Sequence, residues 1–157
     1  VWRLANAKAS PLWRESAGIF WLFLFFSQIN SVREWLWQCK AFPSSLSGML
    51  ERLQSAGSCS PVAAGVQHAK AQLVGTVWNL AMDEGPVRKE ALGRVVLPFM
   101  PTLFRDRSLL VVARACTAAF HLAQVPANAL LLRGVVNPGF DDLLVQMIGR
   151  LNGVKEM

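Results

Sequence analysis

One sequence pattern occurs three times along the chain, and it limits the folds that the chain can adopt. A long apolar stretch ends at residues 77–81 (VWNLA), is interrupted at Gly85-Pro86, and is followed by two short helical segments as far as Phe104. The same order returns from residue 119 (AFHLA) to residue 144, and a looser copy lies between residues 25 and 50. Self-similarity of this kind indicates a repeat protein, in which each unit covers the apolar face of its neighbour.

The spacing of the copies indicates units of about 40 residues that consist of helices alone. Leu80 and Leu122 are 42 positions apart, and Pro98 and Pro138 are 40 positions apart. Armadillo and HEAT units have about this length and contain no strands. A single domain is therefore predicted, with units at approximately 12–54, 61–104 and 107–151.

The residues around each break form a set that is similar to a known repeat. Residues 79–81 (NLA), residues 95–98 (VVLP) and Leu103 follow one another in one copy, and residues 134–138 (GVVNP) precede Leu143-Leu144 in the next. This order resembles the armadillo repeat, in which an Asn-Leu-small motif ends a third helix and a Gly-x-Ile-Pro-x-Leu step leads into the second helix of the following unit. The resemblance implies an all-α, right-handed solenoid of about three armadillo-like repeats. We expect the chain to be a segment of a longer array.

The resemblance also implies where a partner would bind. Armadillo proteins hold extended peptides in a groove lined by their third helices, and the importins use a Trp and an Asn one helical turn apart. Here Asn79 occupies the Asn position, but Gly75 precedes it by one turn and Thr117 precedes His121, so the Trp–Asn ladder is absent. A receptor for nuclear localisation signals is therefore not expected. Residues three and four apart share a helix face, and the groove residues predicted on this basis are Gln72, Thr76, Asn79, Arg114, Ala118 and His121.

A second interpretation of Asn79 stays open, in which its side chain only bonds nearby backbone and fixes the helix end. The net charge of +6 makes a neutral or acidic protein or peptide the better partner. The basic residues are scattered and form no run, so nucleic acid is not expected as a partner. The predicted function is that of a scaffold or adaptor for protein–protein interaction.

No catalytic or cofactor signature accompanies this surface. The sequence contains no Gly-rich phosphate loop, GxSxG, HExxH or kinase motif, and we predict neither an enzyme nor a cofactor. His68 and His121 lack neighbouring Cys or carboxylate partners, so no metal site is predicted. The acid pairs at 83–84 and 141–142 suit helix dipoles. Three widely spaced cysteines predict no disulfide framework and favour a reducing compartment, the cytoplasm or the nucleus.

The most apolar stretch, residues 17–26, is ten residues long and too short to span a bilayer, which needs about 20. A buried core helix is predicted there. The alternative is a membrane-associated helical protein anchored through residues 12–26, because Trp and Phe suit the membrane boundary. Trp35 and Trp37 on the next short helix point to different sides, which predicts one in the core and one exposed as an anchor for a partner.

Overall fold

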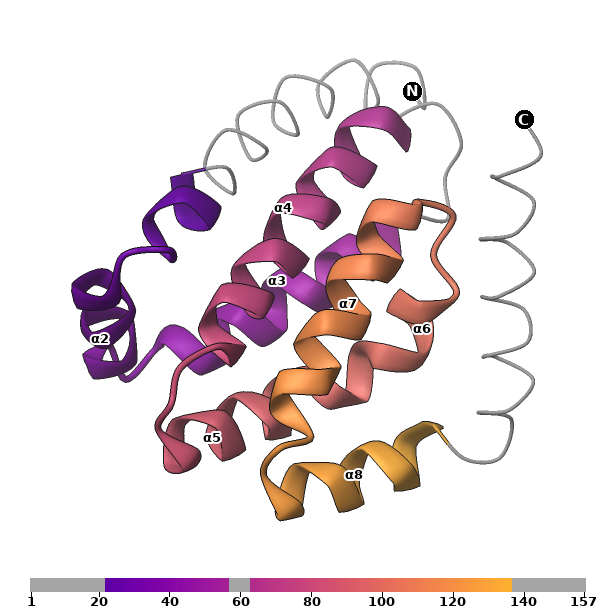
Figure 1. The fold of residues 1–157 in the computed structure, drawn as a ribbon. Coiled ribbons are helices and arrows are strands. Elements are labelled where there is room, and N and C mark those ends of the chain that lie inside the picture. The colour runs from indigo at the N-terminus through magenta and orange to yellow at the C-terminus, as the bar shows by residue number, and fades with distance from the viewer. Residues whose placement is uncertain (1–21, 57–62, 137–157) are drawn as a thin grey trace.

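The computed structural model describes residues 22–56 and 63–136, and both ranges are helical without any strand (Figure 1). The elements are α2 (Asn30–Gln38), α3 (Phe42–Ala56), α4 (Ala63–Ala81), α5 (Pro86–Val96), η2 (Leu97–Phe99), α6 (Met100–Phe104), α7 (Leu109–Leu122) and α8 (Pro126–Val136). Residues 22–26 are also helical and lead through a turn into α2. The all-α prediction is confirmed for this part of the chain. The end of the predicted third unit, residues 137–151, lies outside the described residues.

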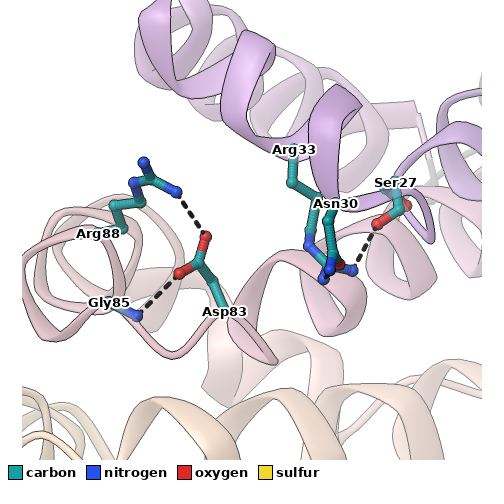
Figure 2. Close-up of polar contacts among 6 residues, drawn as sticks. All are labelled: Ser27, Asn30, Arg33, Asp83, Gly85 and Arg88. Carbon is teal, nitrogen blue, oxygen red and sulfur yellow. Dashed lines mark hydrogen bonds and ion pairs between the residues drawn. The ribbon is translucent and has the colours of Figure 1, made fainter.

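Proline begins two of the helices at corresponding places in the predicted units. Pro86 is the first residue of α5 and Pro126 the first residue of α8, where a missing N–H is tolerated because the first-turn N–H groups have no partner inside the helix. Before α5, the Asp83 carboxylate accepts from the Gly85 N–H at 2.8 Å and pairs with Arg88 at 3.1 Å (Figure 2). These contacts fix the turn between α4 and α5 and place a negative charge at the start of α5, as predicted for Asp83.

Helix α4 lies at the centre of the core. Every residue from Ala69 to Val77 is buried, so no side of the helix is open to solvent along this stretch. Helix α7 shares the most extensive contact with α4 and runs beside it in the same direction, while α3 and α5 pack on its other sides (Figure 1). Apolar residues that follow helical spacing along α4 are all buried: Val66, Ala69, Leu73, Val77 and Leu80.

Lys70 and Asp106 form an ion pair inside the protein, between α4 and the turn that precedes α7. Nζ lies 2.7 Å from Oδ2, and the two side chains are only 7% and 5% exposed. The second carboxylate oxygen accepts from the Ser108 N–H at 2.9 Å, and the Ser108 side chain caps α7 by accepting from the Val111 N–H. The pair therefore meets the requirement that a buried charge be compensated, and it connects α4 to the start of α7.

We predict that Lys70→Ala lowers the free energy of unfolding by about 3–5 kcal/mol, because the Asp106 carboxylate stays buried without its counter-charge. Arg94→Ala is the matched control, since Arg94 pairs with Glu90 at 2.6 Å on the exposed side of α5 and such pairs contribute about 1 kcal/mol or less. Urea unfolding followed by circular dichroism measures both variants. Equal losses of stability would contradict the role given to the buried pair.

The contact between α5 and α8 depends on a glycine. Asn128 of α8 is fully buried, and its Nδ2 donates to the backbone carbonyls of Lys89 at 2.8 Å and Leu122 at 3.1 Å. A Cβ atom on Gly93 would overlap with the Asn128 side-chain amide. Gly93 thus leaves the space that lets one asparagine connect α5, the end of α7, and α8.

A pair of helical glycines tests this contact. Gly93→Ala is expected to lower the free energy of unfolding by about 1–3 kcal/mol, because Asn128 must shift away from its carbonyl partners. Gly48→Ala in α3 is the control, since a Cβ there meets no atom within 4 Å. This change should stabilise the protein by about 0.5–1 kcal/mol through lower backbone entropy of the unfolded chain. Thermal unfolding reports both, and changes of the same sign would contradict the packing described.

Residues 22–26, the part of the apolar stretch that the structure describes, have one side against the core and one side toward solvent. Phe23 packs against the core, whereas Leu22, Phe25 and Phe26 are 46%, 49% and 43% exposed. The prediction of a buried core helix is therefore confirmed for the inner side of residues 22–26 only, and residues 1–21 lie outside the described part. None of the helices in the described ranges has both the length and the apolar character that a membrane crossing requires.

The two tryptophans of α2 lie on different sides, as predicted. Trp37 packs against the core with its ring 6.0 Å from that of Phe42, in an edge-to-face arrangement. Trp35 is 60% exposed. The solvent-facing side of α2 therefore carries an aromatic ring with one apolar face free to meet another molecule.

Candidate interaction surface

The structure places the six predicted groove residues on α4 and α7, which lie side by side, but at different depths and on different sides of α4. Thr76 and Ala118 are buried at 2% and 0% exposure. Gln72 and Asn79 keep 8% each, and Arg114 and His121 are half-buried. Direct contact with a partner is therefore open to the outer members of the set, Arg114 and His121 above all, and the prediction that a partner uses these residues stays a prediction.

Arg114 connects the two helices by polar contacts. Its Nη1 donates to the backbone carbonyl of Ala71 at 2.5 Å and lies 3.5 Å from Gln72 Oε1. The amide nitrogen of Gln72, Nε2, lies 3.2 Å from the ring nitrogen Nε2 of His68. The His68 side chain is exposed. Arg114, Gln72 and His68 thus form a polar line that runs from α7 across α4. We call these three residues the polar line.

Burial of the Arg114 guanidinium lowers its pKa from the usual value, because the partly desolvated site disfavours the charged form. Lys70 and Arg88 each pair with a carboxylate, that of Asp106 and that of Asp83. Arg114 has only neutral acceptors within these ranges. Its positive charge therefore faces the α4–α7 surface without an acidic neighbour in the described part of the chain.

Asn79 does not fix the end of its own helix. Its Nδ2 donates to the carbonyl of Leu24 at 3.2 Å and to Ser27 Oγ at 2.9 Å, more than 50 residues away in sequence. Ser27 is fully buried, and its hydroxyl donates back to the Leu24 carbonyl at 2.8 Å. Arg33 of α2 donates to the Ser27 carbonyl at 3.0 Å (Figure 2). The chain itself therefore occupies the end of the predicted groove that lies near Asn79.

Gly75 lies one helical turn before Asn79, at the position where the importins carry a Trp. In this structure, side chains of Leu24 and Arg114 lie in the space that a side chain at position 75 would fill. A Cβ atom at this position would lie 2.8 Å from Leu24 Cδ1 and 3.0 Å from Arg114 Nη1. The absence of a side chain thus lets Leu24 approach α4 from one side and the Arg114 guanidinium from the other. A sequence without coordinates shows the glycine but not these two neighbours, because both come from distant segments.

An apolar cavity of about 250 Å³ lies on the other side of α4. Phe23, α2 and α3 enclose it against Leu73 and Thr76, and Trp35 lies at its edge. The Thr76 hydroxyl donates to the Gln72 carbonyl at 3.1 Å. Thr76 therefore lines this cavity, which explains why it is absent from the surface on which the sequence placed it.

The described ranges contain no group of three or more His, Cys, Asp or Glu side chains that could hold a metal ion. Cys116 of α7 is half-buried, and burial raises the pKa of its thiol. No protein-family model matches the chain, and neither the curated proteins nor the solved structures compared with it contain a match. The armadillo family therefore stays a prediction from the motifs quoted above.

Asn79→Ala tests whether this side chain holds residues 22–27 against α4. Loss of its two hydrogen bonds should raise the rate of chymotrypsin cleavage at Phe25 and Phe26 about thirtyfold, since each hydrogen bond contributes about 1 kcal/mol and cleavage follows the opened population. Gln38→Ala is the control, because Gln38 is exposed at the other end of α2. Unchanged cleavage of the Asn79 variant would show that other contacts hold the segment.

Proposed function

We propose that the protein is a scaffold for protein–protein interaction, built as an armadillo-like solenoid, whose α4–α7 surface binds a neutral or acidic extended peptide. The arrangement of the described helices supports the repeat interpretation. Helices α4 and α7 lie side by side, each is followed by a short helix that begins with proline, and α5 and α8 pack on each other as well. Such a layer-on-layer order is what stacked repeats need to bury their apolar faces.

The observation that carries the proposal is the half-buried Arg114 cation on the α4–α7 surface, with neutral acceptors alone around it in the described part of the chain. Beside it lie the exposed His68 and the half-buried Thr117 and His121. A partner that supplies backbone acceptors or a negative charge finds donors there that are already fixed in place. Complementary charge of this kind favours both encounter and specificity.

Panning a library of extended peptides on the full chain tests the proposal. The enriched peptides are expected to bind a variant with Thr117→Glu and His121→Glu at least about tenfold more weakly, because two carboxylates on the surface repel acidic peptides and block the groove. A variant with Ala91→Glu and Ala129→Glu carries the same charge change on exposed sites of α5 and α8 and should bind normally. No enrichment, or equal loss in both variants, would contradict the proposal.

A second function, association with a membrane surface, rests on a different observation. Leu22, Phe25 and Phe26 share one side of the helical segment 22–26, and these three residues and Ile29, in the turn that follows, are between 43% and 49% exposed. An apolar stripe of this kind suits the boundary of a bilayer, and the net charge of +6 suits anionic lipid.

Flotation of the protein with anionic vesicles separates this second function from the first. The membrane function predicts that the full chain floats with vesicles of phosphatidylcholine and phosphatidylserine. It also predicts that Phe26→Glu reduces the bound fraction about tenfold or more, because a carboxylate replaces buried aromatic surface. Val87→Glu, at an exposed apolar residue of α5 far along the chain, is the control. Absence of flotation would leave the peptide-binding function alone.

A further inference from the structure

We infer that the polar line is a subsite for a carboxylate side chain, so that the bound peptide is an acidic one with a Glu or Asp opposite Arg114. This inference rests on the proposed function and adds the chemical class of the group that is recognised. It depends on the hydrogen-bonding capacity that Arg114 keeps, on the way its side chain is held, and on the charges around it.

The guanidinium of Arg114 has N–H groups that donate to no acceptor in the described ranges. It carries five N–H groups, and its contacts with the Ala71 carbonyl and Gln72 Oε1 both use Nη1. Within residues 22–56 and 63–136, Nη2 and Nε donate to no acceptor. A carboxylate binds two adjacent N–H groups of an arginine in parallel, which is the strongest geometry available to this pair. The free edge of Arg114 therefore matches the two oxygens of a Glu or Asp side chain.

The position of the guanidinium is set before any ligand arrives. The Ala71 carbonyl holds Nη1 at 2.5 Å, and the side chain lies against Gly75, where a Cβ atom would come within 3.0 Å of Nη1 and 3.2 Å of Cζ. Arginine loses much conformational freedom when it is fixed. Because contacts within the protein already fix it, a ligand meets a lower entropic cost of binding.

A carboxylate also suits the charges that surround the site. The partly buried cation lacks an acidic partner in the described part of the chain, and an incoming anion would offset the desolvation of its charge. Two further cations that are buried or half-buried also lack a carboxylate there. Lys89 Nζ donates to Gln124 Oε1 at 2.8 Å between α5 and the end of α7, and Arg33 of α2 donates to the Ser27 carbonyl. Of these three cations, Arg114 is the one on the α4–α7 surface, next to the exposed His68.

Two peptide pools test the inference with the full chain. Both contain capped 11-residue peptides with uncharged random positions, and they differ only at the central residue, which is Glu in one pool and Gln in the other. We expect the immobilised protein to retain the Glu pool about tenfold better, since charge-assisted hydrogen bonds are about twice as strong as neutral ones. Mass spectrometry of the retained peptides gives the Glu-to-Gln ratio.

Variants assign the preference to the subsite. Arg114→Gln should bring the ratio close to one, whereas Arg52→Gln, which removes the same charge from the exposed side of α3, should leave it unchanged. Arg114→Lys keeps the charge but loses the paired donors, and it should lose most of the preference. Gly75→Ala changes no charge and should also lower the ratio, because it displaces the guanidinium. Circular dichroism confirms that each variant is folded.

The outcomes distinguish failure of the carboxylate subsite from failure of the proposed peptide-binding function. Retention of both pools in equal amounts would overturn the carboxylate subsite while leaving a peptide-binding surface in place. Retention of neither pool would contradict the proposed function itself, and the subsite with it. A Glu preference that survives Arg114→Gln, or that disappears equally with Arg52→Gln, would show that the net positive charge and not this arginine selects the peptide.

Discussion

The burial of helix α4 is the constraint on which the rest of the structure depends. Residues 69–77 are covered on every side, by α7, by α3 and by the contact of Leu24 with Gly75. A helix in this position must be apolar nearly all round, and any polar group on it must find a partner inside the protein. Lys70, Gln72 and Asn79 meet that requirement through Asp106, Arg114 and Ser27. These three buried polar residues of α4 thus connect it to α7, to the turn before α7 and to residues 22–27.

These connections explain why the binding groups lie where they do. Asn79 donates its hydrogen bonds to residues 22–27 and is not available to a partner. In the contact of α4 with α7, by contrast, only Nη1 of Arg114 donates to an acceptor in the described ranges. The guanidinium of Arg114 joins α7 to α4 with one nitrogen, and its other N–H groups donate to no acceptor in the described ranges. A group that belongs to the packing of two helices and also faces the surface is well suited to binding, because the packing holds it still.

The sequence predicts the helices well because their signals are local. The interruption at Gly85-Pro86 coincides with the start of α5, and the apolar residues of α4 at helical spacing are buried. The surface is predicted less well. Helical spacing places Thr76 on one face with Gln72 and Asn79, but it does not show that an apolar cavity and residues 22–27 lie against that face. The partners of Gly75, Gly93 and Lys70 come from distant segments, and no local pattern identifies them.

Native-state hydrogen exchange of the full chain measures the burial of α4 most directly. If α4 is the covered centre of the core, its amides from residue 69 to residue 77 exchange more slowly than those of α2 and only through global unfolding, together with the amides of α7 that pack on them. Exchange of residues 69–77 at the rate of α2, or independently of α7, would contradict the central place of α4 and the surface built on it.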